Sequence, residues 1–139
     1  IAGNFKQDKI DVVITPAIGG IVLGTEVGRI LKARTIFGER ENGIMTLRRG
    51  FELCKGENVL ICEDVVTTGG SVFEIMRLAE DADAILKGVG FIIDRSNGKV
   101  NFGIKQFSLA QFDVVKYSDD EIPDFLSKIP VTKPGSRKL

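Results

Sequence analysis

The 139-residue chain contains no histidine, and its two cysteines do not form a C-x-x-C pair. The lack of histidine excludes Ser-His catalytic triads, histidine metal ligands and histidine general bases. Cys54 and Cys62 predict a reducing compartment and no disulfide, and Cys62, within an apolar run, is interpreted as core filler rather than a nucleophile. Since no apolar run approaches about 18 residues and no signal-peptide pattern opens the chain, we expect a cytoplasmic protein without a membrane span.

An excess of either charge is also lacking. Lysine and arginine total 19 residues, aspartate and glutamate also total 19, and the formal net charge is therefore zero. This balance argues against a nucleic-acid partner, because nucleic-acid-binding proteins usually carry a basic excess. The length favours a single domain over residues 1–139, which can bury roughly two thirds of its unfolded surface.

A central strand–turn–helix pattern is the most informative feature that the chain does contain. Residues 59–62 form a short apolar run with β-branched members, which predicts a buried strand. The chain continues through Glu63, Asp64, Val65 and Val66 into a small, hydroxyl-rich turn made of Thr67, Thr68, Gly69, Gly70 and Ser71. Apolar residues at helical spacing come next. Because Ser71 and Glu74 match a capping box, we predict that a helix begins at Ser71.

This pattern suits a phosphorylated sugar. The first N–H groups of a helix lack internal partners and lie at the positive end of its dipole, and glycines let an anion approach the backbone. The two carboxylates repel a phosphate, but they can accept hydrogen bonds from sugar hydroxyls or help to hold a metal ion. These features fit a ribose 5-phosphate. The alternative is an ordinary strand–helix connection whose acids only cap a turn.

The rest of the chain alternates strands and helices. The patterns predict strands over residues 10–14, 34–38, 84–93, 102–109 and 112–117, and helices over residues 21–32 and after the acids at 119–121. Gly24 and Gly28 in the first of these helices indicate close packing on a sheet, and residues 131–139 are expected to be a loosely held terminus. The order of elements predicts an α/β fold with a mostly parallel central sheet flanked by helices.

A polar, basic stretch over residues 39–50 allows two interpretations. It carries Arg40, Arg48 and Arg49, with glycines near its ends. It is either a solvated hairpin whose arginines face water or a mobile lid that brings the arginines onto a polyanion.

Arg95 lies just past the strand predicted over residues 84–93 and also allows two interpretations. It is either a surface arginine paired with Asp94 or a bidentate ligand for a carboxylate. Ligands bind beyond the carboxyl ends of the strands in a parallel sheet. Arg95, the basic stretch and residues 16–20 can therefore converge on one cleft with residues 63–71.

The chain resembles the type I phosphoribosyltransferases, and in particular the bacterial orotate phosphoribosyltransferases. The motifs that carry this resemblance are Pro16-Ala17-Ile18-Gly19-Gly20, Glu41-Asn42-Gly43, Met45-Thr46-Leu47-Arg48-Arg49-Gly50-Phe51, Glu63-Asp64-Val65-Val66-Thr67-Thr68-Gly69-Gly70-Ser71, Asp94-Arg95 and Lys133-Pro134-Gly135-Ser136-Arg137. The first and fourth occur across type I phosphoribosyltransferases. The Met-Thr-Leu-Arg-Arg-Gly loop and the Lys-Pro-Gly-Ser-Arg tail are the motifs that point to orotate.

The resemblance implies a Rossmann-like core and an Mg²⁺-dependent reaction. Phosphoribose would pass from 5-phosphoribosyl 1-pyrophosphate (PRPP) to N1 of orotate, giving orotidine 5′-monophosphate and pyrophosphate in pyrimidine biosynthesis. The PRPP-binding residues implied are Ala17, Ile18 and Gly19 in a pyrophosphate loop, Glu63 and Asp64 at the ribose hydroxyls, and Val65, Val66, Thr67, Thr68, Gly69, Gly70 and Ser71 around the 5′-phosphate. Orotate would contact Thr67 and Arg95, and Mg²⁺ would be held mainly through PRPP.

The resemblance also implies how the active site is completed. The expected catalytic residues are Asp64, Arg40, Arg48 and Arg49. The arginines lie in a mobile catalytic loop, residues 39–50, which in the family reaches across a homodimer with shared active sites. The family has an N-terminal segment that contributes to the orotate pocket, so we expect this chain to be N-terminally incomplete.

The chain departs from the family pattern in its charged loop residues, and two alternative functions stay open. Many members carry lysine and histidine in the catalytic loop and lysine in the pyrophosphate loop, where this chain has Gly19-Gly20. Arginines must then carry those charges. The alternatives are a type I phosphoribosyltransferase for a purine or uracil, and a non-catalytic PRPP-sensing regulator that binds nucleic acid. Arg95 favours an anionic base, and the balanced charge weighs against the regulator.

Overall fold

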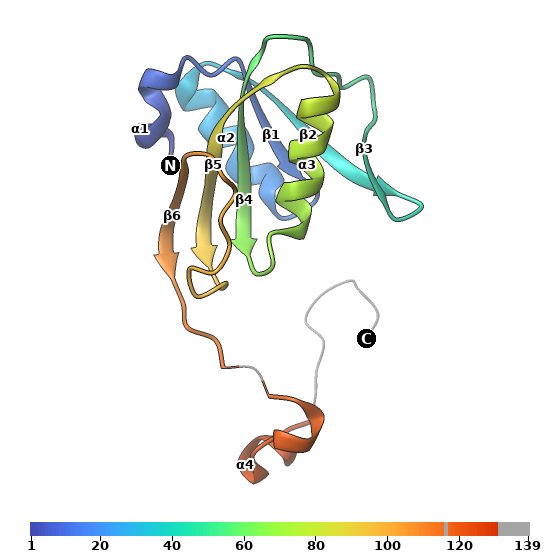
Figure 1. The fold of residues 1–139 in the computed structure, drawn as a ribbon, viewed down its shortest axis with the longest axis vertical. Helices are drawn as coiled ribbons and strands as arrows, with labels where there is room; N and C mark the ends of the chain where they lie inside the picture. The colour runs from blue at the N-terminus through green and yellow to red at the C-terminus, as the bar shows by residue number, and fades with distance from the viewer. Residues whose placement is uncertain (116, 131–139) are drawn as a thin grey trace.

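The computed structural model describes residues 1–115 and 117–130, and the segments with strand-like sequence form one six-stranded sheet. Its strands are β1 (Val12–Pro16), β2 (Arg34–Glu41), β3 (Ile44–Leu47), β4 (Asn58–Val66), β5 (Ile85–Asp94) and β6 (Gln106–Gln111). The helices are α1 (Ala2–Phe5), α2 (Gly20–Leu31), α3 (Gly70–Asp81) and α4 (Asp124–Ser127), with 3₁₀ turns η1 (Lys6–Asp8) and η2 (Asp119–Glu121). Helices α2 and α3 cover opposite faces of the sheet (Figure 1), which confirms the predicted α/β fold.

The strand order places a topological switch point at the centre of the sheet. The order is β3-β2-β1-β4-β5-β6, and neighbouring strands are parallel except for the β2–β3 pair. From β1 the chain passes through α2 to β2 on one side, and it later returns to β4 on the other side of β1. In open α/β sheets ligands bind at such a reversal, beyond the carboxyl ends of the strands. The segments after β1 and within and after β4, which the sequence selected, lie at this point.

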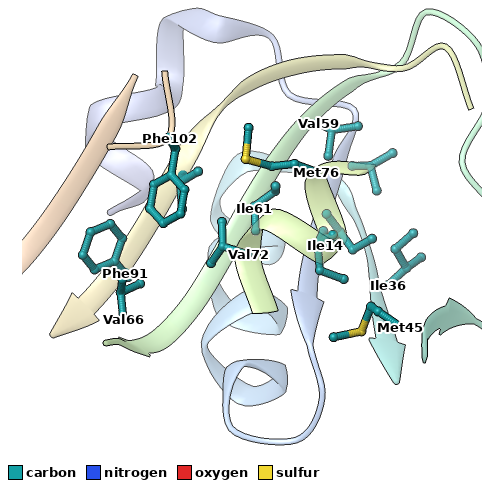
Figure 2. Packing of buried hydrophobic residues seen from close by; sticks show 13 residues of the cluster. Ile14, Ile36, Met45, Val59, Ile61, Val66, Val72, Met76, Phe91 and Phe102 are labelled. Carbon is teal, nitrogen blue, oxygen red and sulfur yellow. The ribbon is translucent and has the colours of Figure 1, made fainter. Parts of the chain in front are cut away.

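Alternate residues of the central strands belong to two separate cores. Val12 and Ile14 of β1 pack in one cluster with Ile75 of α3, whereas Val13 packs in the other cluster with Val27 of α2. Figure 2 shows the α3-side cluster, which extends from Met45 on β3 to Phe91 on β5 and to Phe102. Because both faces of β1 are covered, all of its residues are buried, and all of them except Thr15 are apolar.

Helix α2 packs closely on the sheet through its two interior glycines, as predicted. A methyl group at Gly24 would overlap the side chain of Thr15 on β1, and one at Gly28 would overlap Thr35 Oγ1 on β2. Thr35 Oγ1 also donates a hydrogen bond to the Gly24 carbonyl, at 3.4 Å. The cost of glycine within a helix is therefore offset by the close approach of the helix to the sheet.

The basic stretch 39–50 contains the turn of a β-hairpin. The first strand of this hairpin, β2, extends beyond residue 38, where the sequence predicted its end. β2 continues to Glu41 and pairs with the antiparallel strand β3 through a two-residue turn. The turn residues Asn42 and Gly43 have φ values of 52° and 84°, as a type I′ hairpin turn requires. The predicted end of the strand was wrong because the charged residues 39–41 hide the strand pattern. The Asn-Gly dipeptide, a typical hairpin-turn signal, comes only after them.

The strand expected over residues 102–109 begins later than predicted. Gly103 turns the chain with a φ of 72°, and the Phe102 N–H donates to Gln106 Oε1 at 3.0 Å. Both features turn the backbone before Lys105, whose carbonyl accepts the Val89 N–H of β5 at 2.9 Å, and β6 begins at Gln106.

The prediction of a strand over residues 112–117 was wrong for the residues that the structure describes there. The Phe112 N–H donates to the Asp94 carbonyl at 2.8 Å, and the chain then leaves the sheet and runs towards α4 (Figure 1). The acids at 119–121 form η2, and α4 begins only at Asp124. The predicted tail motif from Lys133 to Arg137 lies outside the described residues. None of the helices in the described part of the chain is long and apolar enough to cross a membrane.

Replacement of Gly24 by alanine tests the contact between α2 and β1. Alanine is favoured over glycine in a helix by about 1 kcal/mol, but its methyl group would overlap the buried Thr15 side chain. We expect overpacking to dominate and to lower the free energy of unfolding in urea by about 1–2 kcal/mol. Gly3→Ala in α1 is the matched control, because no atom lies within 4 Å of its added methyl group. Equal stabilities of the two variants would contradict the close contact.

Candidate active site

The two predicted acids lie on the last residues of β4 rather than beyond its end. β4 continues to Val66, so Glu63 and Asp64 belong to the strand. Glu63 is only 8% exposed, and its Oε1 accepts the Asp64 N–H at 3.0 Å. Asp64 is half-buried, and its Oδ1 accepts the Val65 N–H at 2.7 Å. These local hydrogen bonds hold both carboxylates at the carboxyl edge of the sheet.

The turn after β4 requires glycine at one position. Gly69 has a φ of 76°, and a Cβ there would lie 2.9 Å from Val100 Cγ1 and 3.0 Å from Phe102 Cε1. Glycine meets both demands because it lacks a side chain and tolerates the left-handed conformation. Gly69 is the N-cap of α3, and no side chain caps the helix. The first N–H groups of α3 therefore face the turn without an internal partner, as an anion site requires.

The predicted capping box at Ser71 and Glu74 was wrong. Gly69 already occupies the N-cap position, so α3 begins at Gly70 and Ser71 lies inside the helix. The Glu74 carboxylate instead accepts a hydrogen bond from the Arg40 guanidinium, at 2.5 Å. Glu74 thus pairs with Arg40 of the β2–β3 hairpin instead of capping α3 as the sequence pattern had predicted.

A cavity of about 240 Å³ lies over the turn after β4, and we call it the turn cavity. It is lined by Arg40, Glu63 and residues 65–72. The Arg40 guanidinium lies 3.4 Å from Ser71 Oγ, in addition to its bond with Glu74. The fold therefore brings the predicted Arg40 from the hairpin to the predicted phosphate turn.

The turn after β1 lies directly against the acids of β4. A Cβ at Gly20 would lie 3.1 Å from the Cys62 carbonyl oxygen and 3.4 Å from Glu63 Oε1. A methyl group at Gly19 would overlap the Asp64 carboxylate. The structure thus brings together the two segments that the sequence had selected separately, and glycines at both positions make the approach possible.

The other two arginines of the basic stretch lie away from the turn cavity. Arg49 Nε is 3.0 Å from Glu39 Oε1, and an Arg48 guanidinium nitrogen is 3.3 Å from Glu41 Oε1. These two arginines directly follow the β2–β3 hairpin, and they pair with glutamates of β2 instead of facing water alone. Their catalytic role and the mobility of the stretch remain predictions.

A second cavity, of about 430 Å³, adjoins the turn cavity at Thr67 and Thr68, which line both. We call it the Arg95 cavity, and its other lining residues are Arg95, Ser96, Asn97, Lys99, Val100 and Val114. Asp94 accepts the Ser96 N–H at 2.7 Å, and within residues 1–115 and 117–130 it forms no ion pair with Arg95. The sequence analysis missed Lys99, although a second basic residue four positions after Arg95 was visible.

Known proteins resemble the chain in sequence and in fold. The model of the Phosphoribosyl transferase domain matches residues 1–101. The orotate phosphoribosyltransferase of Chlorobium phaeobacteroides strain BS1 is 54% identical over 139 residues, which cover 100% of this chain and 72% of that protein. The crystal structure of adenine phosphoribosyltransferase from Rhodothermus marinus has a TM-score of 0.67 at 21% identity, covering 79% of this chain and 74% of that chain. The orotate phosphoribosyltransferase structure from Aeropyrum pernix has a TM-score of 0.63 at 19% identity, covering 78% and 64%.

Thiol labelling tests the burial of Cys62 beside the acids. Cys62 is fully buried, and burial raises the pKa of its thiol to about 12, whereas Cys54 is exposed. The thiolate is the reactive form, so we expect a disulfide reagent at pH 8 to label one thiol in the folded protein and two in denaturant. The folded Cys54→Ser variant should not be labelled at all. Rapid labelling of that variant would contradict the burial of Cys62.

Proposed function

Since the chain belongs to the phosphoribosyl transferase family, and within it to the orotate phosphoribosyltransferases, we propose that it transfers phosphoribose from PRPP to orotate. The products are orotidine 5′-monophosphate and pyrophosphate, in pyrimidine biosynthesis. The observation that carries the proposal is the contact between two cavities of different chemistry. Thr67 and Thr68 separate a turn suited to a phosphate from a cavity that Arg95 lines, so a ribose 5-phosphate and an anionic base can lie next to each other.

The carboxylates of β4 suit the charge that develops during this transfer. The bond from ribose C1′ to the pyrophosphate oxygen breaks, the bond from C1′ to orotate N1 forms, and N1 loses its proton. Positive charge develops on the ribose ring in between. Glu63 and Asp64 lie at the edge of the sheet, where they can accept hydrogen bonds from the ribose hydroxyls and stabilise that charge. The backbone N–H groups of α3 and the hydroxyls of Thr67, Thr68 and Ser71 would bind the 5′-phosphate.

The departing pyrophosphate needs cations, and we propose that arginines of the hairpin supply them. Gly19 leaves no room for a side chain beside Asp64, and Ala17 and Ile18 are apolar, so the turn after β1 contributes no cationic side chain. Arg40 already lines the turn cavity, while Arg48 and Arg49 pair with Glu41 and Glu39. A pyrophosphate carries more negative charge than one carboxylate and can draw such arginines away from their glutamates.

We propose Mg²⁺ as the cofactor, held mainly through the oxygens of PRPP. Mg²⁺ prefers oxygen ligands and often takes only one or two protein carboxylates, with substrate phosphates and water completing its shell. The half-buried carboxylate of Asp64 suits this role, because it lies at the carboxyl edge beside the turn after β1. When bound, Mg²⁺ would offset the negative charge that forms on the pyrophosphate.

We further propose a cytoplasmic homodimer with shared active sites. Phe112, Phe125 and Ile129 follow β6 on a segment that leaves the sheet, and each is more than half exposed. A partner subunit would remove such apolar side chains from water. Both cysteines are free, as a reducing compartment favours.

Two substitutions should separate the roles of the two cavities. We expect Asp64→Asn to lower kcat/KM for PRPP on the order of a hundredfold, because the ribose loses a stabilising charge. We expect Arg95→Ala to raise the KM for orotate about tenfold to a hundredfold and to change the KM for PRPP little, because a charged hydrogen-bond donor is lost. Steady-state kinetics with each substrate varied in turn would measure both effects.

Arg29→Ala is the matched control for the loss of an arginine. Arg29 is exposed on α2 and pairs only with Glu26 of the same helix in the described part of the chain, so its removal should leave both KM values unchanged. An unchanged orotate KM in Arg95→Ala would remove Arg95 from the base site.

The assay that tests the function follows consumption of orotate with Mg²⁺ and PRPP, with adenine, hypoxanthine and uracil in parallel. We expect turnover of orotate alone, because the cation of the Arg95 cavity matches a carboxylate that the other bases lack. Turnover of a neutral base in place of orotate would overturn the proposal. Binding of PRPP without turnover of any base would point to a regulator.

A further inference from the structure

A second basic side chain lines the cavity that Arg95 lines. Lys99 follows Arg95 by four residues, and both are exposed to solvent at this cavity. Thr67 and Thr68, shared with the turn cavity, lie on its border, and Val100 and Val114 supply apolar surface. Besides Ser96 and Asn97, the cavity thus combines two cations, two threonine hydroxyls and two valines, which suits a flat heterocycle with an anionic substituent.

The turn between the two cations is held in place by hydrogen bonds. The Lys99 N–H donates to the Ser96 carbonyl at 3.2 Å, and the Val100 N–H donates to Ser96 Oγ at 3.2 Å. Asn97 Nδ2 donates to Asp113 Oδ1 at 2.6 Å. Ser96 itself is buried. Because these bonds fix the backbone on both sides of the turn, the backbone that carries Arg95 and Lys99 does not have to be ordered when a ligand binds.

Arg95 and Lys99 differ from the arginines of the basic stretch 39–50 in that they lack an acidic partner among the described residues. Arg40, Arg48 and Arg49 each pair with a glutamate. Across residues 1–115 and 117–130, neither Arg95 nor Lys99 forms an ion pair. The two nearest acids along the chain are engaged elsewhere, because Asp94 accepts the Ser96 N–H and Asp113 accepts from Asn97. Among the described residues, the cavity therefore presents two positive charges without an acidic partner.

We propose that Lys99 is a specificity-determining residue that binds the carboxylate of the base together with Arg95. This inference rests on the proposed function, since it assigns a second ligand to the orotate of that reaction. The two side chains bind an anion in different ways, because the planar guanidinium of Arg95 can bind both oxygens of a carboxylate and the Lys99 ammonium acts as a point charge. A neutral base in the same cavity leaves both cations uncompensated. Lys99 therefore favours an anionic base over a neutral one.

Calorimetry with two nucleotides tests this role on the whole gene product. Orotidine 5′-monophosphate and uridine 5′-monophosphate share the ribose phosphate and the pyrimidine ring, and only the first has the carboxylate. We expect Lys99→Met to weaken binding of orotidine 5′-monophosphate about tenfold or more and to leave binding of uridine 5′-monophosphate unchanged. The KM for orotate should rise by a similar factor while the KM for PRPP stays the same.

Two further variants separate a direct role from a structural one. Lys99→Arg keeps the charge and should retain most of the affinity for orotidine 5′-monophosphate. Lys6→Met removes an exposed lysine from η1, which lies near the amino end of β6, where Asp8 pairs with Lys105, and should change neither affinity. Equal losses for both nucleotides in Lys99→Met, or a loss in Lys99→Arg as large as in Lys99→Met, would overturn the role in carboxylate recognition.

The same measurements distinguish failure of this inference from failure of the proposed function. If the unmodified protein binds orotidine 5′-monophosphate no more tightly than uridine 5′-monophosphate, the choice of orotate itself is wrong. If the unmodified protein discriminates and Arg95→Ala abolishes the difference, but Lys99→Met retains it, the function stands and Lys99 has no part in it.

Discussion

The parallel pairing of β1 with β4 is the constraint on which the site depends. Val12, Val13 and Ile14 pair with residues 59–61, so the carboxyl ends of the two strands meet at the same edge of the sheet. The turn after β1 then lies against the last residues of β4, with Gly19 beside Asp64 and Gly20 beside Glu63. Any side chain at these glycines would have to displace a carboxylate or the Cys62 backbone. Close packing of α2 through Gly24 supports the same arrangement, because α2 begins within this turn.

The basic side chains near the two cavities differ in whether they already have an acidic partner. On the hairpin, each arginine already has a glutamate partner, so a phosphate group must compete with a protein carboxylate for it. In the Arg95 cavity, the cations lie on a turn fixed by hydrogen bonds and have no ion pair among the described residues. A carboxylate that enters there loses its water but does not have to break an ion pair. The proposed base site is thus pre-organised, while the proposed pyrophosphate site requires an exchange of partners.

Much of the fold and of the site followed from local patterns. The strand, turn and helix over residues 59–79 and the glycines of α2 were predicted because burial and backbone geometry there depend on near neighbours in the sequence. The capping box failed because Gly69, pressed against Val100 and Phe102, took the N-cap position. A hairpin was one of the two interpretations of residues 39–50, but the end of its first strand was wrong because charged residues hide the strand pattern there. The expected strand after β6 failed because the chain leaves the sheet at that point.

The sequence by itself determined the chemistry that is available: a glycine- and hydroxyl-rich turn after two acids, basic residues after strand ends, and no histidine. It also determined the α/β class, because periodicity and glycine placement are local properties. Only the tertiary structure decided which of these groups meet. The contact of Gly19 with Asp64, the bond from Arg40 to Glu74, and the common cavity of Thr67, Arg95 and Lys99 join residues far apart in the chain. Such contacts depend on strand order and register, which are set by the packing of the whole sheet rather than by any single segment.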